Sequence, residues 1–219
     1  MKKIRAIPTE YNGYKFRSRL EARWAFFFDS LKIDYEYEPE GYYLSDGRRY
    51  LPDFRVTNCD GSQIYYEVKR KNSKGDGKLE CLIKDLEKGL EYDPITGNVV
   101  GNYIFGEVLS GDPVDVLLSG EYGICPRCLS ISKEIDAEVS RIFEYGLPST
   151  IDVYCFNCDF YMRVKDYEKH NIGYGYYFHE GNLVLNKQHD VFLFCKTVVD
   201  CANAARKVRF EYGETPKVI

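Results

Sequence analysis

Apolar residues recur at three- and four-residue spacing in the segment FRSRLEARWAFFFDSLKI, residues 16–33. This period predicts a helix with one buried face. Ser18 followed by Glu21 has the spacing of a capping box, which predicts the start of the helix at the serine. The stripe expected to face the core comprises Leu20, Trp24, Phe27, Phe28 and Leu31.

A period of two follows this helix and predicts three strands joined by turns. The first strand should end near Pro39, and Asp46-Gly47 and the segment NCDGS are turn signals. The strands are therefore expected to pair as an antiparallel meander. They are predicted in IDYEYEPEGYYL from residue 33 to near Pro39, at 48–56 (RRYLPDFRV) and at 63–70 (QIYYEVKR).

A second helix and a fourth strand complete this part of the chain. The loop NSKGDG precedes KLECLIKDLEKGLEY, residues 78–92, whose leucines share one helical face, and NYIFGEVL, residues 102–109, is typical of a strand. A helical crossover after a meander predicts an α/β (α+β) fold, a mixed sheet flanked by helices.

The last third of the chain has a different pattern. Residues 174–194 are expected to be strand-like, and 197–214 are expected to form a final helix. Thr197 and Asp200 can cap that helix, and Gly213 can end it.

Charge, cysteine content and the lack of long apolar runs indicate the cellular compartment of the protein more clearly than its function. The net charge is −4, but the first 24 residues and the stretch around Arg206 are locally basic. The N-terminus lacks the apolar segment of a secretory signal, and no apolar run approaches the length of a membrane span. We expect a cytoplasmic protein without membrane contact, in which cysteines are thiols or metal ligands.

Three charged residues interrupt the second and third predicted strands. If these strands pair through the 58–62 turn, Asp53 and Glu67 meet on one side of the sheet, with Lys69 two residues beyond the second acid. Two carboxylates form a hard-oxygen site suited to Mg²⁺ or Mn²⁺, and the lysine can steady a water or a phosphate. An exposed hairpin with weak ion pairs is the alternative interpretation of these residues.

The residues Pro52–Phe54 and Glu67–Lys69 resemble the PD-(D/E)XK signature of the restriction-endonuclease-like nuclease superfamily. The order helix, three strands, helix, strand is also similar to that family, and the phrase from FRSRLEARWA to YEVK resembles a group of phage and bacterial nucleases. The closing ARKVRFEYGE resembles their final helix. The resemblance covers residues 10–109 and about 195–214.

The resemblance implies a set of site residues. Asp53, Glu67 and the Val68 carbonyl would hold Mg²⁺, and Lys69 would position or activate the attacking water. Glu21 would hold the metal through water, or it serves only in the capping box; both roles remain open. Arg17, Arg19 and Arg209 are candidate phosphate contacts, with ordinary solvated arginines as the alternative.

Two CxxC pairs lie outside the part of the chain that the resemblance covers. Four thiolates in two such pairs can close a tetrahedral zinc site, as in zinc ribbons. A closed site of this kind is structural. The pairs are Cys125 with Cys128 and Cys155 with Cys158.

These observations predict a nuclease core in residues 1–119, a zinc-ribbon-like insertion in 120–168, and a C-terminal part, 169–219, that completes the core. The expected activity is that of a Mg²⁺-dependent DNA endonuclease, phage-encoded and acting in the host cytoplasm. The alternative is a catalytically silent nucleic-acid-binding or adaptor protein, for example a phage counter-defence or recombination factor. DNA, a second copy of the chain, and a host or phage protein docked on the zinc module are the expected partners.

Overall fold

The computed structural model describes residues 6–57, 61–97, 99–119 and 193–210, together with short strands between 123 and 185. Side chains are described within these ranges up to residue 117, at Ile131, and over 198–210. No helix in these parts of the chain is long and apolar enough to cross a membrane.

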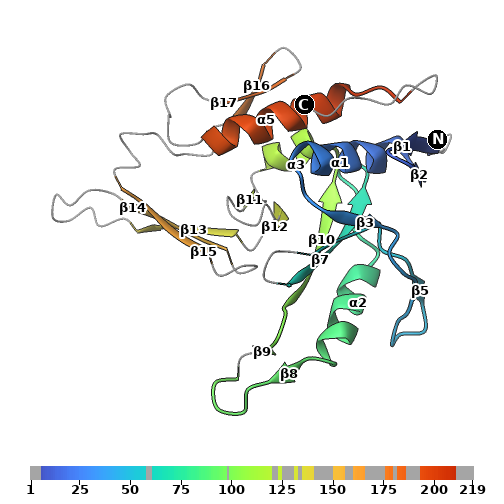
Figure 1. Cartoon of the computed structure of the whole chain (residues 1–219), viewed down its shortest axis with the longest axis vertical. Coiled ribbons are helices and arrows are strands. Elements are labelled where there is room, and N and C mark those ends of the chain that lie inside the picture. Colours follow the sequence, from blue (N-terminus) through green and yellow to red (C-terminus); the bar gives the residue numbers. More distant parts are fainter. Residues whose placement is uncertain are drawn as a thin grey trace.

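A four-stranded mixed sheet organises the molecule (Figure 1). Its strand order is β10-β7-β6-β3, with β7 antiparallel to β6 and parallel to β10. The parallel pair requires a crossover, which runs through the helix α2. The strands are β3 (Tyr35–Tyr37), β6 (Phe54–Thr57), β7 (Gln63–Lys69) and β10 (Ile104–Ser110), and α2 spans Lys78–Glu87.

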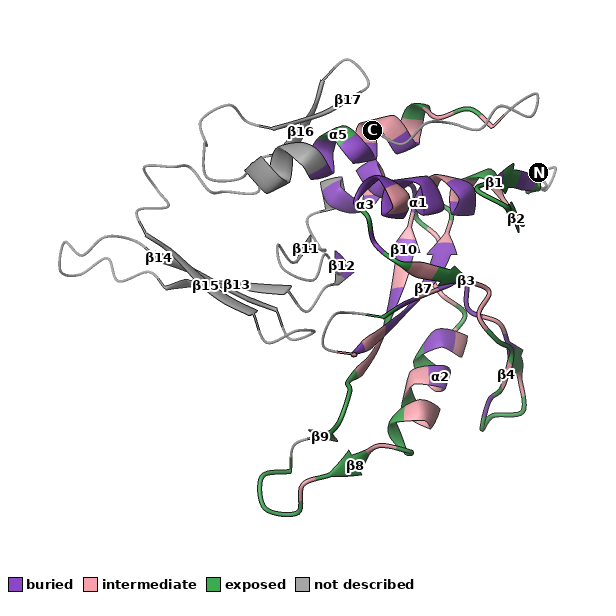
Figure 2. Cartoon of the chain, viewed as in Figure 1, coloured by how far each residue is buried: buried purple, intermediate pink, exposed green. Residues whose placement is uncertain are grey.

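Helices cover both faces of this sheet, so the fold is mixed α/β as predicted. Alternation along β7 sends Tyr66 to one face and Tyr65 to the other. Tyr66 joins the larger core under three helices, and Tyr65 packs with Leu79 and Leu82 of α2. Buried residues lie on both α1 and α2 (Figure 2). The three helices are α1 (Arg19–Ser30), α3 (Pro113–Ser119) and α5 (Leu193–Lys207).

The helix α1 is buried more completely than its periodicity predicts. Ser18 is its N-cap, as expected, and the Ser18 hydroxyl accepts a hydrogen bond from the Glu21 amide at 3.2 Å. Beyond the predicted stripe, Ala22, Ala25 and Phe26 are also buried, whereas Leu20 is only partly buried. Since α1 lies between the sheet and the C-terminal helix, it has apolar neighbours on more than one side (Figure 1).

Three two-stranded hairpins accompany the sheet, and the first of them precedes α1 in the chain. In the second, Gly47 adopts φ +84°, as the predicted Asp46-Gly47 turn requires. The hairpins are β1–β2 (Thr9–Tyr11, Tyr14–Phe16), β4–β5 (Tyr42–Tyr43, Arg49–Tyr50) and β8–β9 (Glu91–Tyr92, Val99–Val100).

Between α3 and α5, Ile131 is the residue with a described side chain, and it joins the main core. Ile131 is 1% exposed and belongs to the large apolar cluster. The Tyr66 hydroxyl accepts a hydrogen bond from the Ile131 amide at 3.0 Å and donates one to its carbonyl at 3.1 Å. The strands of this segment are β11 (Gly123–Ile124), β12 (Ile131–Ser132), β13 (Ile135–Ser140), β14 (Thr150–Cys155), β15 (Phe160–Lys165), β16 (Tyr176–His179) and β17 (Asn182–Leu185).

Several predicted boundaries were wrong. The first predicted strand ends at Tyr37, close to Pro39 as predicted, but the residues after the turn at 38–41 form a separate strand, β4. The second predicted strand is divided into β5 and β6, because the chain turns at 51–53. The final helix begins at Leu193, so Thr197 and Asp200 lie inside it and cap nothing. It also ends at Lys207, six residues before Gly213.

Candidate active site

The strand register places the two predicted acids opposite one another. Phe54 of β6 pairs with Tyr66 of β7, so Asp53 and Glu67 are the next facing positions along the two strands. The Asp53 amide donates to the Tyr66 carbonyl at 3.2 Å, which extends the ladder to the acid itself. Both carboxyl groups are buried, with 7% and 5% of each residue exposed.

Asp53 is held by a backbone amide and a guanidinium group. One carboxylate oxygen accepts a hydrogen bond from the Val68 amide at 2.7 Å, and the other pairs with Arg17. Burial raises the pKa of Asp53 from 3.8 to about 7; the Val68 amide and Arg17 oppose this rise, while the charges of Glu21 and Glu67 add to it. The carboxyl therefore changes its charge near neutral pH in the metal-free protein.

Glu67 has one satisfied and one unsatisfied oxygen. Lys69 Nζ lies 2.6 Å from Glu67 Oε1. Glu67 Oε2 is buried and has no hydrogen-bond partner among the described residues. A buried acceptor without a donor destabilises the fold, so Oε2 is available for a cation or a water.

Tyr50 and Gly75 lie beside this site, although neither belongs to the sequence motif that predicted it. The buried Tyr50 hydroxyl also has no hydrogen-bond partner in the described part of the chain, and its pKa is raised by burial and by the nearby charges of Glu67 and Asp53. Gly75 passes so close that a Cβ added there would lie 3.4 Å from Glu67 Oε2. Its position in a predicted loop could have indicated a close approach of backbone.

The Glu21 carboxylate is fully engaged by local donors. Its Oε1 accepts from the Ser18 hydroxyl at 2.7 Å, and its Oε2 accepts from the Tyr37 hydroxyl at 2.7 Å and the Arg17 amide at 3.0 Å. This network gives Glu21 the capping role. Its charge nevertheless acts on Asp53, so it lies at the edge of the same site.

The donor set can be tested against Mg²⁺, the cation that the sequence implies. No group of three His, Cys, Asp or Glu side chains suited to a metal occurs within the described ranges. Mg²⁺ does not require one, because it is commonly bound by one or two carboxylates and retains several waters. The Val68 amide donates toward Asp53, and in a strand the carbonyl of the same residue faces the same edge. Asp53, the unsatisfied Glu67 oxygen and that carbonyl therefore fit a hard cation.

A cleft of about 470 Å³ lies beside these groups. Lys69 and Val68 line it from β7, and Arg19 and Glu21 line it from the start of α1. A substrate could therefore approach Lys69 from solvent.

The predicted phosphate contacts divide into two places. Arg17 points inward, where its Nε lies 2.7 Å from Glu38 and a terminal nitrogen pairs with Asp53. Arg19 and Arg209 instead line one pocket with several other cations.

The proposed zinc ligands mostly lie outside the described residues. Cys125, Cys128 and Cys158 are among those not described, and Cys155 is described only as the last backbone position of β14. The backbone pairing is that of two antiparallel hairpins, β11–β12 and β14–β15, and each CxxC pair falls at the connection of one hairpin.

Comparisons with known proteins found no matching family model, no similar curated protein and no similar solved structure.

Proposed function

We propose that the protein is a metal-dependent endodeoxyribonuclease of the restriction-endonuclease-like class. The observation that carries the proposal is the convergence of Asp53 and Glu67 from paired strands, with Lys69 in contact with Glu67 and one Glu67 oxygen unsatisfied. The element order α1-β3-β6-β7-α2-β10 is the order expected of that fold. A Cys₄ zinc ribbon within 120–168 remains part of the proposal.

Each site residue has a task in phosphodiester hydrolysis. Asp53 and Glu67 would hold Mg²⁺ or Mn²⁺ with the Val68 carbonyl. When bound, the ion supplies a Lewis acid for the phosphoryl oxygens and lowers the pKa of water. Lys69 faces the cleft and can donate to a phosphate oxygen while orienting the attacking water. Val68 and Arg17 hold Asp53 in place by hydrogen bonds.

The second candidate function is a binding or adaptor protein that retains this fold without cleavage. Arg17 favours it, because this guanidinium pairs with Asp53 and would have to give way, at least in part, when a cation binds. The presence of both acids and the lysine favours the enzyme.

Cleavage assays with matched variants separate the two functions. Purified protein is incubated with supercoiled, linear duplex, single-stranded and branched DNA, in Mg²⁺, in Mn²⁺ and in EDTA. Glu67→Gln removes the charge that holds the ion at nearly constant shape, and Lys69→Ala removes the cleft donor. Both variants should lose cleavage while keeping DNA binding.

Glu36→Gln is the control, since Glu36 lies on β3 and pairs with Arg55 away from the site. It should cleave like the wild type. If the wild type cuts no DNA form with either ion, the enzyme proposal fails and the binding function stands.

A further inference from the structure

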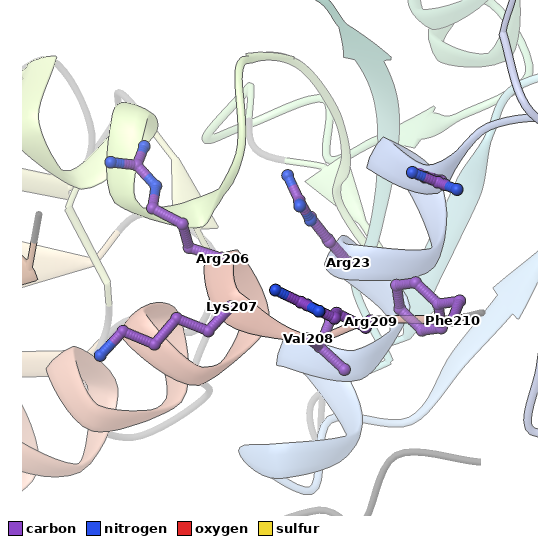
Figure 3. Close-up of a pocket in the computed structure, with 7 residues that line it drawn as sticks. Arg23, Arg206, Lys207, Val208, Arg209 and Phe210 are labelled. Atoms are coloured by element: carbon purple, nitrogen blue, oxygen red, sulfur yellow. The ribbon is translucent and has the colours of Figure 1, made fainter. Parts of the chain in front are cut away.

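A second pocket, of about 500 Å³, lies between the first turns of α1 and the end of α5 (Figure 3). Arg23 lines it from α1, and Arg206 and Lys207 line it from the end of α5; in Figure 3 the latter two side chains point away from Arg23. Among the described residues that line it, none is acidic. The lining consists of Arg19, Arg23, Arg206, Lys207, Val208, Arg209 and Phe210.

Helix stability explains only part of this charge. Cations in the last turn interact favourably with the helix dipole, which accounts for Arg206 and Lys207. The dipole amounts to about half an elementary charge, so it does not account for Arg19, Arg23 and Arg209 at the same place.

One member of the pocket is fixed by the fold. Arg206 bonds both oxygens of Asp112, at 2.6 and 2.7 Å, and lies 2.7 Å from Asp115. These carboxylates belong to the α3 segment behind the pocket and do not line it. Arg206 is therefore held in place by the fold, and its charge is largely compensated.

Three of the other cations lack such compensation among the described residues. No carboxylate in the described part of the chain pairs with Arg23, Lys207 or Arg209, and the buried Arg23 Nε has no acceptor there. A buried charged donor without an acceptor is more costly than an ordinary unsatisfied group. A bound anion would supply the acceptor and would relieve the repulsion among the cations.

Arg19 connects this pocket to the candidate active site. It lines both the cationic pocket and the cleft that contains Lys69 and Val68. Arg23 follows one helical turn later, about 6 Å along α1. A single nucleic-acid strand with one phosphate at Lys69 could therefore continue past Arg19 into the pocket.

We propose that this pocket is a second phosphate subsite, which holds a backbone phosphate of the DNA substrate outside the scissile position. The proposal rests on the proposed function for the identity of the ligand. Guanidinium groups suit it because they form bidentate hydrogen bonds with phosphate oxygens. The subsite would set the register of the strand relative to Asp53 and Glu67.

The test measures DNA binding without added divalent cation, where no cleavage is expected. Fluorescence anisotropy with a short labelled duplex is recorded over a series of salt concentrations for the wild type, Arg23→Gln, Lys207→Gln and Arg209→Gln. Each variant should bind severalfold more weakly, and the slope of log affinity against log salt should fall by about 0.9 for each phosphate that the variant no longer neutralises. Arg206 is left intact, because its removal would leave Asp112 and Asp115 without their partner.

Lys84→Gln is the charge-matched control, because Lys84 is exposed on α2, across the sheet from the pocket. It should keep the wild-type affinity and slope. Circular dichroism verifies that each variant is folded, and the exposed Arg209 provides a variant with little effect on packing.

The proposal would be overturned if all three pocket variants kept the wild-type DNA affinity and salt slope, or if Lys84→Gln lost as much DNA affinity as they do. It would also be overturned if the pocket variants bound phosphatidylserine vesicles more weakly than the wild type while their DNA binding was unchanged. A wild type that binds DNA but never cleaves it would refute the enzyme and leave the subsite standing. An active enzyme with unaffected pocket variants would refute only the subsite.

Discussion

Asp53→Asn should stabilise the metal-free protein, and the gain should increase with pH. The pKa of this carboxyl is raised from 3.8 to about 7, chiefly by burial. Between these two values the folded chain binds a proton that the unfolded chain has released. Stability therefore falls as the pH rises from about 4 to about 7 and is level above that range. Asparagine does not ionise, so the variant escapes this loss.

The size of the effect follows from the pKa shift. Each unit corresponds to about 1.36 kcal/mol, so ionised Asp53 destabilises the fold by about 4 kcal/mol at about pH 8. Asparagine keeps an acceptor for the Val68 amide, and the contribution of Arg17 is already contained in the raised pKa. The net gain should be about 4 kcal/mol at about pH 8 and about 2 kcal/mol at about pH 5.

Urea unfolding without added divalent cation at these two pH values measures the difference, with Asp34→Asn as an exposed control that should change neither value. Added Mg²⁺ should narrow the gap, because a ligand at about a hundred times its Kd stabilises the wild type by about 2.7 kcal/mol and should not bind the variant. A variant that is less stable than the wild type at the higher pH, or whose gain does not depend on pH, would refute the buried-carboxylate reasoning.

Two further outcomes are expected. Metal analysis of protein purified without chelator should find about one zinc per chain, held by Cys125, Cys128, Cys155 and Cys158, as a Cys₄ site requires; folded protein without zinc would contradict this. Tyr66→Phe should lower the free energy of unfolding by about 2–4 kcal/mol, because it leaves the buried Ile131 amide and carbonyl without partners. Tyr43→Phe, at a side chain with 75% exposure, should be neutral, and an equal urea midpoint for both variants would contradict the anchoring role of Tyr66.

Local patterns in the sequence predicted the parts of the fold that depend on near neighbours. The Ser18–Glu21 spacing located the start of α1, and alternation through QIYYEVK located β7 and the faces of its side chains. The facing of Asp53 and Glu67 also followed, because a turn between adjacent strands fixes their register. The helix α3 was missed, since seven residues are too few for a periodic pattern to stand out.

Contacts between distant segments left no local signal. Arg19 and Arg23 of α1 line the same pocket as Arg209. Hydrophobic periodicity predicts each of these segments separately and does not predict which segments pack together. The strand pattern predicts positions for Tyr37 and Tyr50 but no role for their hydroxyl groups. The Tyr37 hydroxyl donates a hydrogen bond to Glu21, and Tyr50 lies near the charges of Glu67 and Asp53. Likewise, the Tyr66 contact with Ile131 joins residues 65 positions apart.

The arrangement of the two acids is difficult to explain by stability alone. Adjacent strands place two buried carboxylates side by side, where an apolar pair would pack at lower free energy. Arg17 reaches one oxygen of Asp53 and Lys69 one oxygen of Glu67, and Glu67 Oε2 is left without a donor among the described residues. A bound divalent cation would satisfy that oxygen and favour the ionised form of Asp53 at once. A local arrangement that opposes folding and that one ligand would relieve is what a functional site requires.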